Sequence, residues 1–352
     1  MNRTELILSV ILPVWNTEVY FEECLNSLVS QMDEHGEIIV VDDGSTDACG
    51  AIADRYSRQY PELIRVYHQE NLGNLIARYR GISHARGRYI GFVDSDDTVS
   101  DRWYASILNV IRSQEPDMIL LRWQKYDDEG HLFDTDRPPL FADGPVSKKE
   151  VLRVFFSSQR VTGLPLKVVK RSLFTEETDY SDKGRRRLME DKLMSIQLFE
   201  NAETFWYISD ILYHYRTNLR SITIRPHENE HFTLTYTYPP VDAYLKRSGY
   251  DSEEFRTILV ENYASVMWEI MLKTHRVSEK NDALRIYAEI RGFPFTSLIF
   301  EYRDRFTLPE YKLQGISLLL EGAYEAAYAY VGKIRENPDL DHRPDLRKLG
   351  KL

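Results

Sequence analysis

A short apolar run that ends in three carboxylates constrains this chain more than any other stretch. Residues 89–93 (YIGFV) are aromatic, β-branched or small, a composition typical of a buried strand. Asp94, Asp96 and Asp97 follow at once. Aspartate is disfavoured inside strands and common in turns, so these acids are expected just past the carboxyl end of the strand. Open α/β sheets bind their ligands at that end of the strands.

Three carboxylates so close together repel one another unless a cation or strong hydrogen-bond donors neutralise them. Mg²⁺ and Mn²⁺ bind carboxylate oxygens and complete their coordination shell with substrate phosphates, so a divalent metal site is one prediction. An acidic turn in which Asp97 and Asp101 cap the next helix is the alternative. This segment alone leaves both open.

The first third of the chain alternates between two hydrophobic periods. Strands are predicted at residues 6–14, 37–41, 63–67, 88–93 and 118–121, and helices at residues 18–32, 47–60, 74–85 and 102–112. Such alternation predicts an α/β fold with a Rossmann-like, mainly parallel sheet and helices on both faces.

Polar loops follow these strands, and in such a sheet they share one edge. An aromatic face at Trp15, a carboxylate at Asp43 and metal ligands at Asp96 would together suit a nucleotide. Each also has a structural explanation: Trp15 as a core residue, residues 42–44 as a turn, and Gly73 as a helix cap. The joint arrangement favours the nucleotide.

The length and composition of the chain limit what kind of protein it can be. The 352 residues suggest two domains, and 43% hydrophobic residues suffice for a core. A net charge of −10 argues against a nucleic-acid partner.

Cys24 and Cys49 are expected to be buried thiols in a reducing compartment. The first residues lack a basic signal region and the apolar run at 6–14 is too short to span a bilayer, so we expect a cytoplasmic protein with a peripheral contact at the cytoplasmic membrane.

Four segments carry a family resemblance. They are SVILPVWN at residues 9–16, IIVVDDGSTD at 38–47, NLG with a following AR pair at 71–78, and DSDD at 94–97. In this order and spacing they resemble the family-two inverting glycosyltransferases, which have the A-type glycosyltransferase fold, over about the first 220 residues. The resemblance implies transfer of a sugar from a UDP-sugar donor to a hydroxyl of a saccharide acceptor, lipid-linked, in the synthesis of a bacterial surface polysaccharide.

The same resemblance assigns the donor site. Pro13 and Trp15 would line the nucleotide pocket, with Trp15 stacking on uracil. Asp43 would accept a hydrogen bond from the uracil ring, and Arg78 would approach the base or the diphosphate. The remaining implied donor-site residues are Asp94 near the ribose, Ser95 beside it, and Asp96 as the main ligand of Mn²⁺ or Mg²⁺. Tyr79 stands where the family often has Asn, which leaves the fine shape of the pocket open.

Two later segments complete the implied site. Residues 189–192 (MEDK) match the family's Glu-Asp pair, in which Asp191 would be the general base for the acceptor hydroxyl. Without the resemblance, Glu190 and Asp191 would be read as acids complementing a helix dipole. Residues 213–223 (YHYRTNLRSIT) match a loop in which Arg216 and Arg220 would clamp the diphosphate. Surface arginines are the alternative for both.

We therefore expect a catalytic domain over residues 1–223, with a nucleotide-binding half at 1–122 and an acceptor half at 123–223, a helical region at 224–335 and a mobile tail at 336–352. Residues 123–145 are predicted to be a loop with one hairpin. The tyrosine-rich helical region is either a bundle packed around its own core or a platform of exposed tyrosines and basic residues for the acceptor or a membrane surface.

Two other function classes remain. A sugar-phosphate nucleotidyltransferase would show a glycine-rich, basic phosphate loop near its start, which residues 13–17 are not. A non-catalytic sugar-nucleotide-binding module would have no need of the 190–191 acids or the arginine loop.

Overall fold

The computed structural model describes residues 5–127, 132–133, 138–158, 160–175, 190–217 and 230–337. Its contacts divide the chain into two compact units. The first unit comprises residues 1–155 and 159–218, and the second comprises residues 156–158 and 219–352. Arg220 and the tail from residue 338 lie outside the described residues, so the predictions made for them stay predictions.

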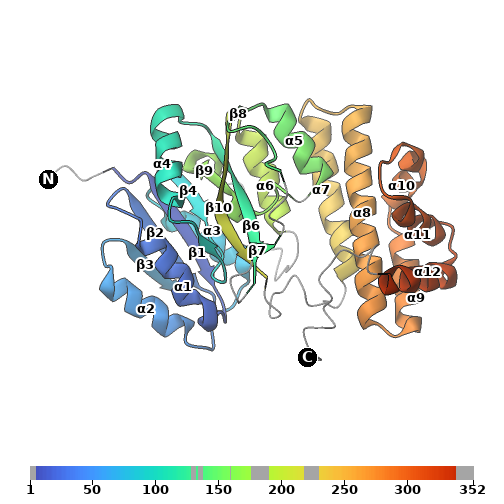
Figure 1. The fold of residues 1–352 in the computed structure, drawn as a ribbon, viewed down its shortest axis with the longest axis horizontal. Helices are drawn as coiled ribbons and strands as arrows, with labels where there is room; N and C mark the ends of the chain where they lie inside the picture. Colours follow the sequence, from blue (N-terminus) through green and yellow to red (C-terminus); the bar gives the residue numbers. More distant parts are fainter. Residues whose placement is uncertain are drawn as a thin grey trace. The chain divides into compact units, whose positions relative to one another are not determined.

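A single sheet runs through the first unit (Figure 1). Its strands are β1 (Leu8–Val14), β2 (Gly36–Asp42), β3 (Ile64–His68), β4 (Tyr89–Phe92), β5 (Thr98–Val99), β6 (Met118–Tyr126), β7 (Leu132–Phe133), β8 (Gly144–Val146), β9 (Lys167–Lys170) and β10 (Phe205–Arg216). The order is β3-β2-β1-β4-β9-β6-β10-β5. Strands β3, β2, β1 and β4 are mutually parallel, β6 is parallel to β10, and β9 lies antiparallel between β4 and β6. The predicted α/β sheet is confirmed.

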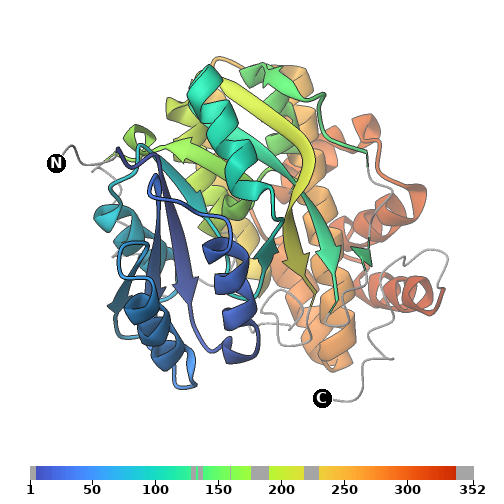
Figure 2. The same ribbon diagram turned by 60° about the vertical axis from the view of Figure 1, so that its left-hand side comes forward.

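Helices cover both faces of this sheet (Figure 2). On one face, α1 (Glu18–Val29), α2 (Cys49–Gln59) and α4 (Trp103–Gln114) share a core with alternate residues of β1, such as Leu8, Val10 and Leu12. On the other face, α3 (Asn74–His84) packs so closely that a Cβ on Gly81 would come 2.4 Å from Ile11 Cγ2. Two further helices are α5 (Lys148–Ser157) and α6 (Glu190–Asn201). Cys24 and Cys49 are both buried and free, as expected for core thiols.

One sequence prediction in this unit is wrong. Residues 123–126 were expected in a loop, but β6 continues to Tyr126. The strand is extended because β10, whose last residues pair with it as far as Arg216, offers a long parallel partner. The hydrophobic pattern of β6 alone cannot reveal its full length, since the partner strand lies about ninety positions away in the sequence. The predicted hairpin is present, with β7 pairing antiparallel to Lys125 and Tyr126.

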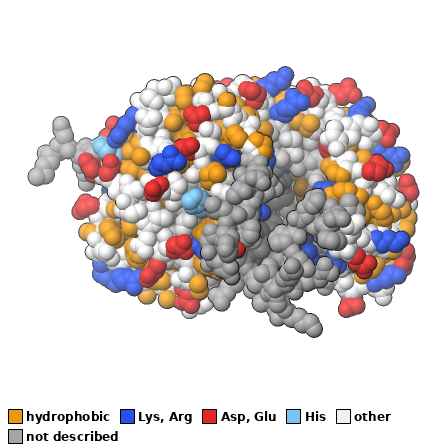
Figure 3. Space-filling model, viewed as in Figure 1, with side chains coloured by type: hydrophobic (Ala, Val, Ile, Leu, Met, Phe, Trp, Pro, Cys, Tyr) orange, Lys and Arg blue, Asp and Glu red, His pale blue; other side chains and the backbone are white. Residues whose placement is uncertain are grey.

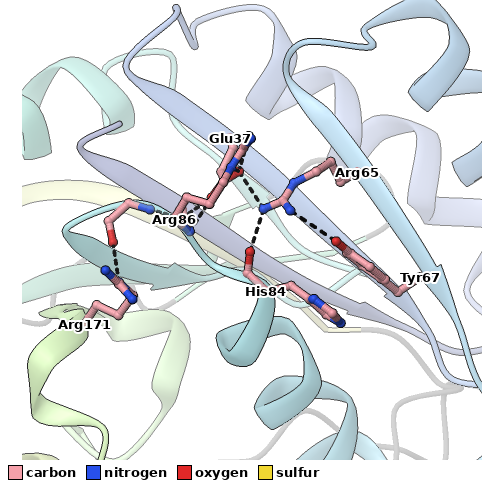
Figure 4. A network of polar contacts seen from close by, with 8 residues as sticks. Glu37, Arg65, Tyr67, His84, Arg86 and Arg171 are labelled. Atoms are coloured by element: carbon pink, nitrogen blue, oxygen red, sulfur yellow. Dashed lines mark hydrogen bonds and ion pairs between the residues drawn. The ribbon is translucent and has the colours of Figure 1, made fainter. Parts of the chain in front are cut away.

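A network of hydrogen bonds and ion pairs links the amino ends of the parallel strands (Figure 4). Glu37 at the start of β2 is buried and pairs with Arg65 and Arg86, each at 2.7 Å. Its carboxylate also accepts a hydrogen bond of 2.6 Å from Ser9 Oγ on β1. Although burial opposes ionisation, the hydroxyl, backbone and arginine donors hold the pKa of Glu37 below its ordinary value. The network lies at the opposite end of the strands from the acidic loop, so it stabilises the scaffold.

The second unit is helical. Its helices are α7 (Thr233–Arg247), α8 (Glu253–Val277), α9 (Lys280–Arg291), α10 (Thr296–Tyr302), α11 (Glu310–Leu320) and α12 (Tyr324–Glu336). Trp268 is buried, and Gly315 of α11 lies so close that a Cβ there would come 2.1 Å from the indole. Tyr244, Tyr263 and Tyr287 are at most 1% exposed, which favours the core interpretation of the tyrosines over the platform.

Described acidic and basic side chains are interspersed over the face drawn in Figure 3. Among the described helices, none combines the length and the apolar character that crossing a membrane requires.

Candidate active site

The loops singled out in the sequence share one edge of the sheet. Strands β2, β1 and β4 are neighbours, and their carboxyl ends carry Asp43, Trp15 and Asp94 respectively. The amide of Asp43 donates to Val14 O at 2.9 Å, which joins the first two loops directly. The structure therefore brings Trp15, Asp43 and Asp94 to one edge of the sheet.

Trp15 lies at this edge with its side chain exposed. It is 39% exposed, so the interpretation of Trp15 as a core residue is wrong, whereas Pro13 is buried within β1. Asn16 follows with a left-handed φ of 52° and accepts a hydrogen bond of 2.8 Å from the Thr46 amide. This bond ties the Trp15 loop to the loop after β2, so the indole is presented from a fixed backbone.

Asp43 organises the third loop. Its side chain is 4% exposed and accepts hydrogen bonds from the amides of Leu72 and Gly73, each at 2.8 Å, and from Gln69 Nε2 at 2.7 Å. Gly73 adopts a φ of 97°, which an L side chain rarely tolerates, as it turns into α3. Beyond any contact with a base, Asp43 therefore sets the shape of the loop at residues 69–73.

The acidic loop after β4 is held in place from β10. Tyr213 Oη donates to Asp97 Oδ2 at 2.5 Å and accepts from the Asp94 amide at 3.2 Å. The Arg216 amide donates to Asp97 Oδ1 at 2.8 Å. Burial and the charges of Asp96 and Asp94 raise the pKa of Asp97 well above its ordinary value. Helix α4 begins at Trp103 without a side-chain cap, so the alternative in which Asp97 and Asp101 cap it is wrong.

Arg216 is a buried support of this loop. It is 5% exposed, its guanidinium lies over the rings of Tyr20 and Tyr126 at 4.7 and 4.4 Å, and Nε donates to Asp96 O at 2.9 Å. The same side chain pairs with Glu23 of α1. These contacts give Arg216 a positioning function, and the diphosphate contact expected from the sequence stays a prediction. Ser95 is also buried and accepts from Thr17 Oγ1 at 2.8 Å.

One arginine joins the acidic loop to the second acidic segment. Arg78 of α3 is 2% exposed and donates through Nη2 to Asp94 Oδ1 at 2.8 Å and through Nη1 to Asp191 Oδ1. The Asp94 and Asp191 side chains are 29% and 27% exposed. Asp191 Oδ2 accepts from the Leu164 amide at 3.4 Å. Burial raises the pKa of Asp94, while Arg78 opposes that shift. The two carboxylates therefore flank one buried guanidinium.

Lys167 is a site residue that the sequence interpretation missed. It is fully buried at the start of β9 and donates to the carbonyls of Thr162 and Gly163 at 2.8 and 2.7 Å. Burial lowers the pKa of Lys167 to about 7, against the opposing influence of Asp191. The signal was a lysine inside an apolar run, LPLKVV at residues 164–169. The side chain fixes the backbone that leads to the Leu164 amide.

The acidic loop fits a divalent cation that a substrate helps to coordinate. Asp94, Asp96 and Asp97 place three carboxylates within four positions, and burial together with the charges of Asp96 and Asp94 raises the pKa of Asp97. A cation would lessen the repulsion among these carboxylates. Among the described residues, no cluster of three or more His, Cys, Asp or Glu side chains is arranged to hold a metal by itself. Mg²⁺ and Mn²⁺ sites commonly use one or two carboxylates together with substrate phosphates, which suits this loop.

The first unit has the fold of an A-type glycosyltransferase, and the helical region follows it. The crystal structure of Staphylococcus aureus TarS 1–349 in complex with UDP-GlcNAc aligns with a TM-score of 0.66 at 18% identity, over 94% of this chain and 92% of that one. Sequence relatives define the family. EpsH of Bacillus subtilis (strain 168) is 33% identical over 251 residues, covering 70% of this chain and 71% of EpsH. Glycosyltransferase GlyG of Streptococcus pneumoniae serotype 4 is 30% identical over 248 residues, covering 68% and 79%.

The model of the family "Glycosyl transferase family 2" matches residues 9–174, which contain β1 from its second residue, the strands β2 to β4 and the acidic loop. The chain belongs to this family and is a glycosyltransferase.

Proposed function

We propose that the protein transfers a sugar from a UDP-sugar to a hydroxyl group of a saccharide acceptor, with inversion at the anomeric carbon. The proposal rests on Arg78, which donates to both Asp94 and Asp191. One side chain thereby brings a donor-side acid and an acceptor-side acid into a single site. A one-step displacement requires a base for the acceptor hydroxyl next to the bound donor, and this pairing would hold such a base there.

Asp191 is the proposed general base. A sugar hydroxyl is a poor nucleophile at neutral pH, and a carboxylate within hydrogen-bond reach can take its proton as the new bond to the anomeric carbon forms. Its 27% exposure leaves a surface that an acceptor can approach. The acceptor oxygen is the nucleophile in this scheme, so no covalent intermediate with the protein is needed and the configuration inverts.

Donor recognition is proposed for the edge formed by β1 and β2. The exposed indole of Trp15 would stack on uracil, and Asp43, already fixed by three donors, would accept from the ring. Pro13 and Ser95 would shape the pocket walls, and Asp94 would lie near the ribose. TarS binds UDP and UDP-GlcNAc in its solved complexes, which supports UDP as the carrier.

A divalent ion, Mn²⁺ or Mg²⁺, would be held by Asp96 together with the donor diphosphate, and when bound it would stabilise the negative charge of the departing nucleoside diphosphate. Arg216 supports the loop that presents Asp96. Arg216 and Arg220 are the proposed cationic contacts to the diphosphate.

The remaining expectations are proposals of the same kind. The acceptor would be a lipid-linked saccharide in the synthesis of a bacterial surface polysaccharide, reached at the inner face of the cytoplasmic membrane by a cytoplasmic protein. Residues 1–122 would bind the nucleotide and 123–223 the acceptor, with the helical region of 224–335 following.

Incubation with a panel of UDP-sugars and Mn²⁺, without acceptor, tests the reaction class. Slow UDP release is expected from one or a few donors. Release of diphosphate from UTP and a sugar phosphate would instead indicate a nucleotidyltransferase, and binding without turnover would indicate a binding module.

Calorimetry with UDP tests the metal site. Both EDTA and Asp96→Ala should weaken UDP binding, and unchanged affinity in both would refute the metal site.

A further inference from the structure

His68 at the end of β3 lies between two carboxylates. Its Nδ1 lies 2.9 Å from Asp42 Oδ2, and its Nε2 lies 3.1 Å from Asp54 Oδ1. Asp42 is the last residue of β2 and pairs with His68 in the parallel ladder, whereas Asp54 belongs to α2. A Cβ on Gly50 would come 3.0 Å from Asp42 Oδ2, so the glycine allows α2 to approach this contact closely.

The charge of the imidazole follows from these two contacts. A neutral imidazole carries one N–H group, so one ring nitrogen would present its lone pair to a carboxylate oxygen. The imidazolium carries two N–H groups and can donate to both acids, so this geometry is that of the charged ring. The hydrogen bond to Asp42 is the main cause that raises the pKa of His68, Asp54 adds to the effect, and burial opposes it.

Other charged side chains on the surrounding elements do not offset these two acids. Side chains of a strand alternate between its faces, so Arg65 leaves β3 on the face opposite the imidazole. Arg55 of α2 pairs with Glu22. Arg58 of α2 and Glu70, which follows β3, are both exposed. The charges that change the pKa of the imidazole are those of the two acids, and both favour the protonated ring.

Asp42 connects His68 to the loops of the proposed uracil site. Its other oxygen, Oδ1, accepts a hydrogen bond of 3.0 Å from the Ser45 amide in the loop after β2. Ser45 Oγ in turn accepts from the Asn16 amide at 3.3 Å, directly after Trp15. A chain of contacts therefore runs from the imidazole through Asp42 and Ser45 to the backbone that presents the indole.

Gln69, the next residue after His68, binds the neighbouring acid of the same loop. Its amide donates to Asp42 O at 2.9 Å, and its Nε2 donates to Asp43 Oδ1 at 2.7 Å. Because successive side chains leave a strand on opposite faces, His68 and Gln69 hold the two acids from the two faces of the sheet. The end of β3 therefore positions both Asp42 and Asp43, the second of which is proposed to bind the uracil ring.

We propose that His68 is a positioning residue for donor binding, whose imidazolium holds the loop after β2 in the conformation that receives uracil. The inference rests on the proposed UDP site. Loss of a ring proton would place a lone pair against one carboxylate, which weakens the contact with Asp42 and the turn at Ser45. UDP affinity should therefore be highest while the imidazole is charged, and it should fall as pH rises through the pKa of His68.

Calorimetry with UDP and Mn²⁺ on the full-length protein, from about pH 5.5 to about pH 8.5, tests the inference. His68→Asn keeps a neutral donor near Asp42 but cannot titrate. Wild-type affinity should fall about tenfold over this range relative to the variant, as loss of one charge-assisted hydrogen bond implies. His35→Asn, directly before β2, is the control and should follow the wild-type profile. The titration of UDP itself is the same for every protein compared.

Asp54→Asn keeps the test informative if His68→Asn does not fold in thermal melting, because the Asp54 side chain is 49% exposed. Removing its charge should lower the pKa of His68, so the fall in UDP affinity should move to lower pH. Affinity at the acid end of the range should stay unchanged. A histidine with only a structural role would give no such shift.

Parallel pH profiles for wild type and folded His68→Asn would overturn the inference, and so would an unmoved midpoint in Asp54→Asn. Wild-type protein that binds no UDP at any pH would refute the proposed function, and with it the site that His68 is inferred to position. UDP binding whose pH profile is the same with and without the imidazole would refute only the role of His68.

Discussion

Arg78 on α3 donates to the carboxylate of Asp191 at the start of α6, although the two residues lie 113 positions apart in the chain. The arginine is 2% exposed and also holds Asp94, so the guanidinium is enclosed between two acids from different segments. A buried charge is stable only when it is paired, which makes this contact a strict constraint on how α3, α6 and the acidic loop assemble. The proposed donor side and the proposed acceptor side of the site are joined through it.

Replacing the proposed base tests the mechanism. Asp191→Asn keeps the size of the side chain and removes its ability to take a proton. Turnover should fall by about 10² to 10⁴ with donor affinity retained, because the proposed donor contacts come from other residues. Steady-state kinetics with UDP calorimetry measures both. Glu190→Gln is the matched variant, and it should lose less activity. Normal turnover in Asp191→Asn with an inactive Glu190→Gln would move the base by one residue.

The bridge that Arg78 forms between Asp94 and Asp191 can be tested by a conservative change. Arg78→Lys keeps the charge but replaces a planar fork with one ammonium, which cannot reach Asp94 and Asp191 in the same way. We expect kcat to fall by about tenfold to a hundredfold, because misplacement of a catalytic group by about 1 Å costs that much. Arg112→Lys, an exposed residue of α4, is the control. An Arg78→Lys protein with normal kcat would show that the bridge does not position Asp191.

Base stacking predicts a separate effect. Trp15 is exposed at the sheet edge, so Trp15→Ala should leave thermal stability nearly unchanged. It should weaken UDP binding by about 1–3 kcal/mol, the usual cost of losing one base–aromatic stack. Trp15→Phe should restore most of the affinity. Calorimetry with UDP and GDP measures the outcome, and wild-type protein that bound both nucleotides equally would refute recognition of uracil at this edge.

The buried carboxylate of Glu37, in the polar network at the amino ends of the strands, makes the free energy of unfolding depend on pH. The pKa of Glu37 is lowered in the folded protein, so its contribution is fully present above the unfolded pKa and is lost as pH falls through the folded value. Glu37→Gln should cost about 3 kcal/mol at pH 7, since it leaves paired arginine donors without their charge partner. Denaturant unfolding at pH 7 and at pH 4 and below should show the difference from wild type shrinking with acidification. Exposed Glu62→Gln is the control, and a difference independent of pH would contradict the assignment.

The sequence by itself determined the scaffold and the family. Alternating hydrophobic periods predicted the strands and helices of the first third to within a few residues, because each buried face repeats locally along the chain. The motifs around Trp15, Asp43 and Asp94 predicted the shared edge, since parallel strands place their carboxyl ends together.

Tertiary structure alone decided the partners of each charge. Arg78 with Asp191, Tyr213 with Asp97 and Lys167 with the carbonyls before β9 are contacts between segments whose separation carries no periodic signal. The length of β6 likewise depends on its pairing with β10. Local patterns record which face of an element is buried, whereas pairing of buried polar groups depends on how distant elements pack, and that arrangement is set by the folded core as a whole.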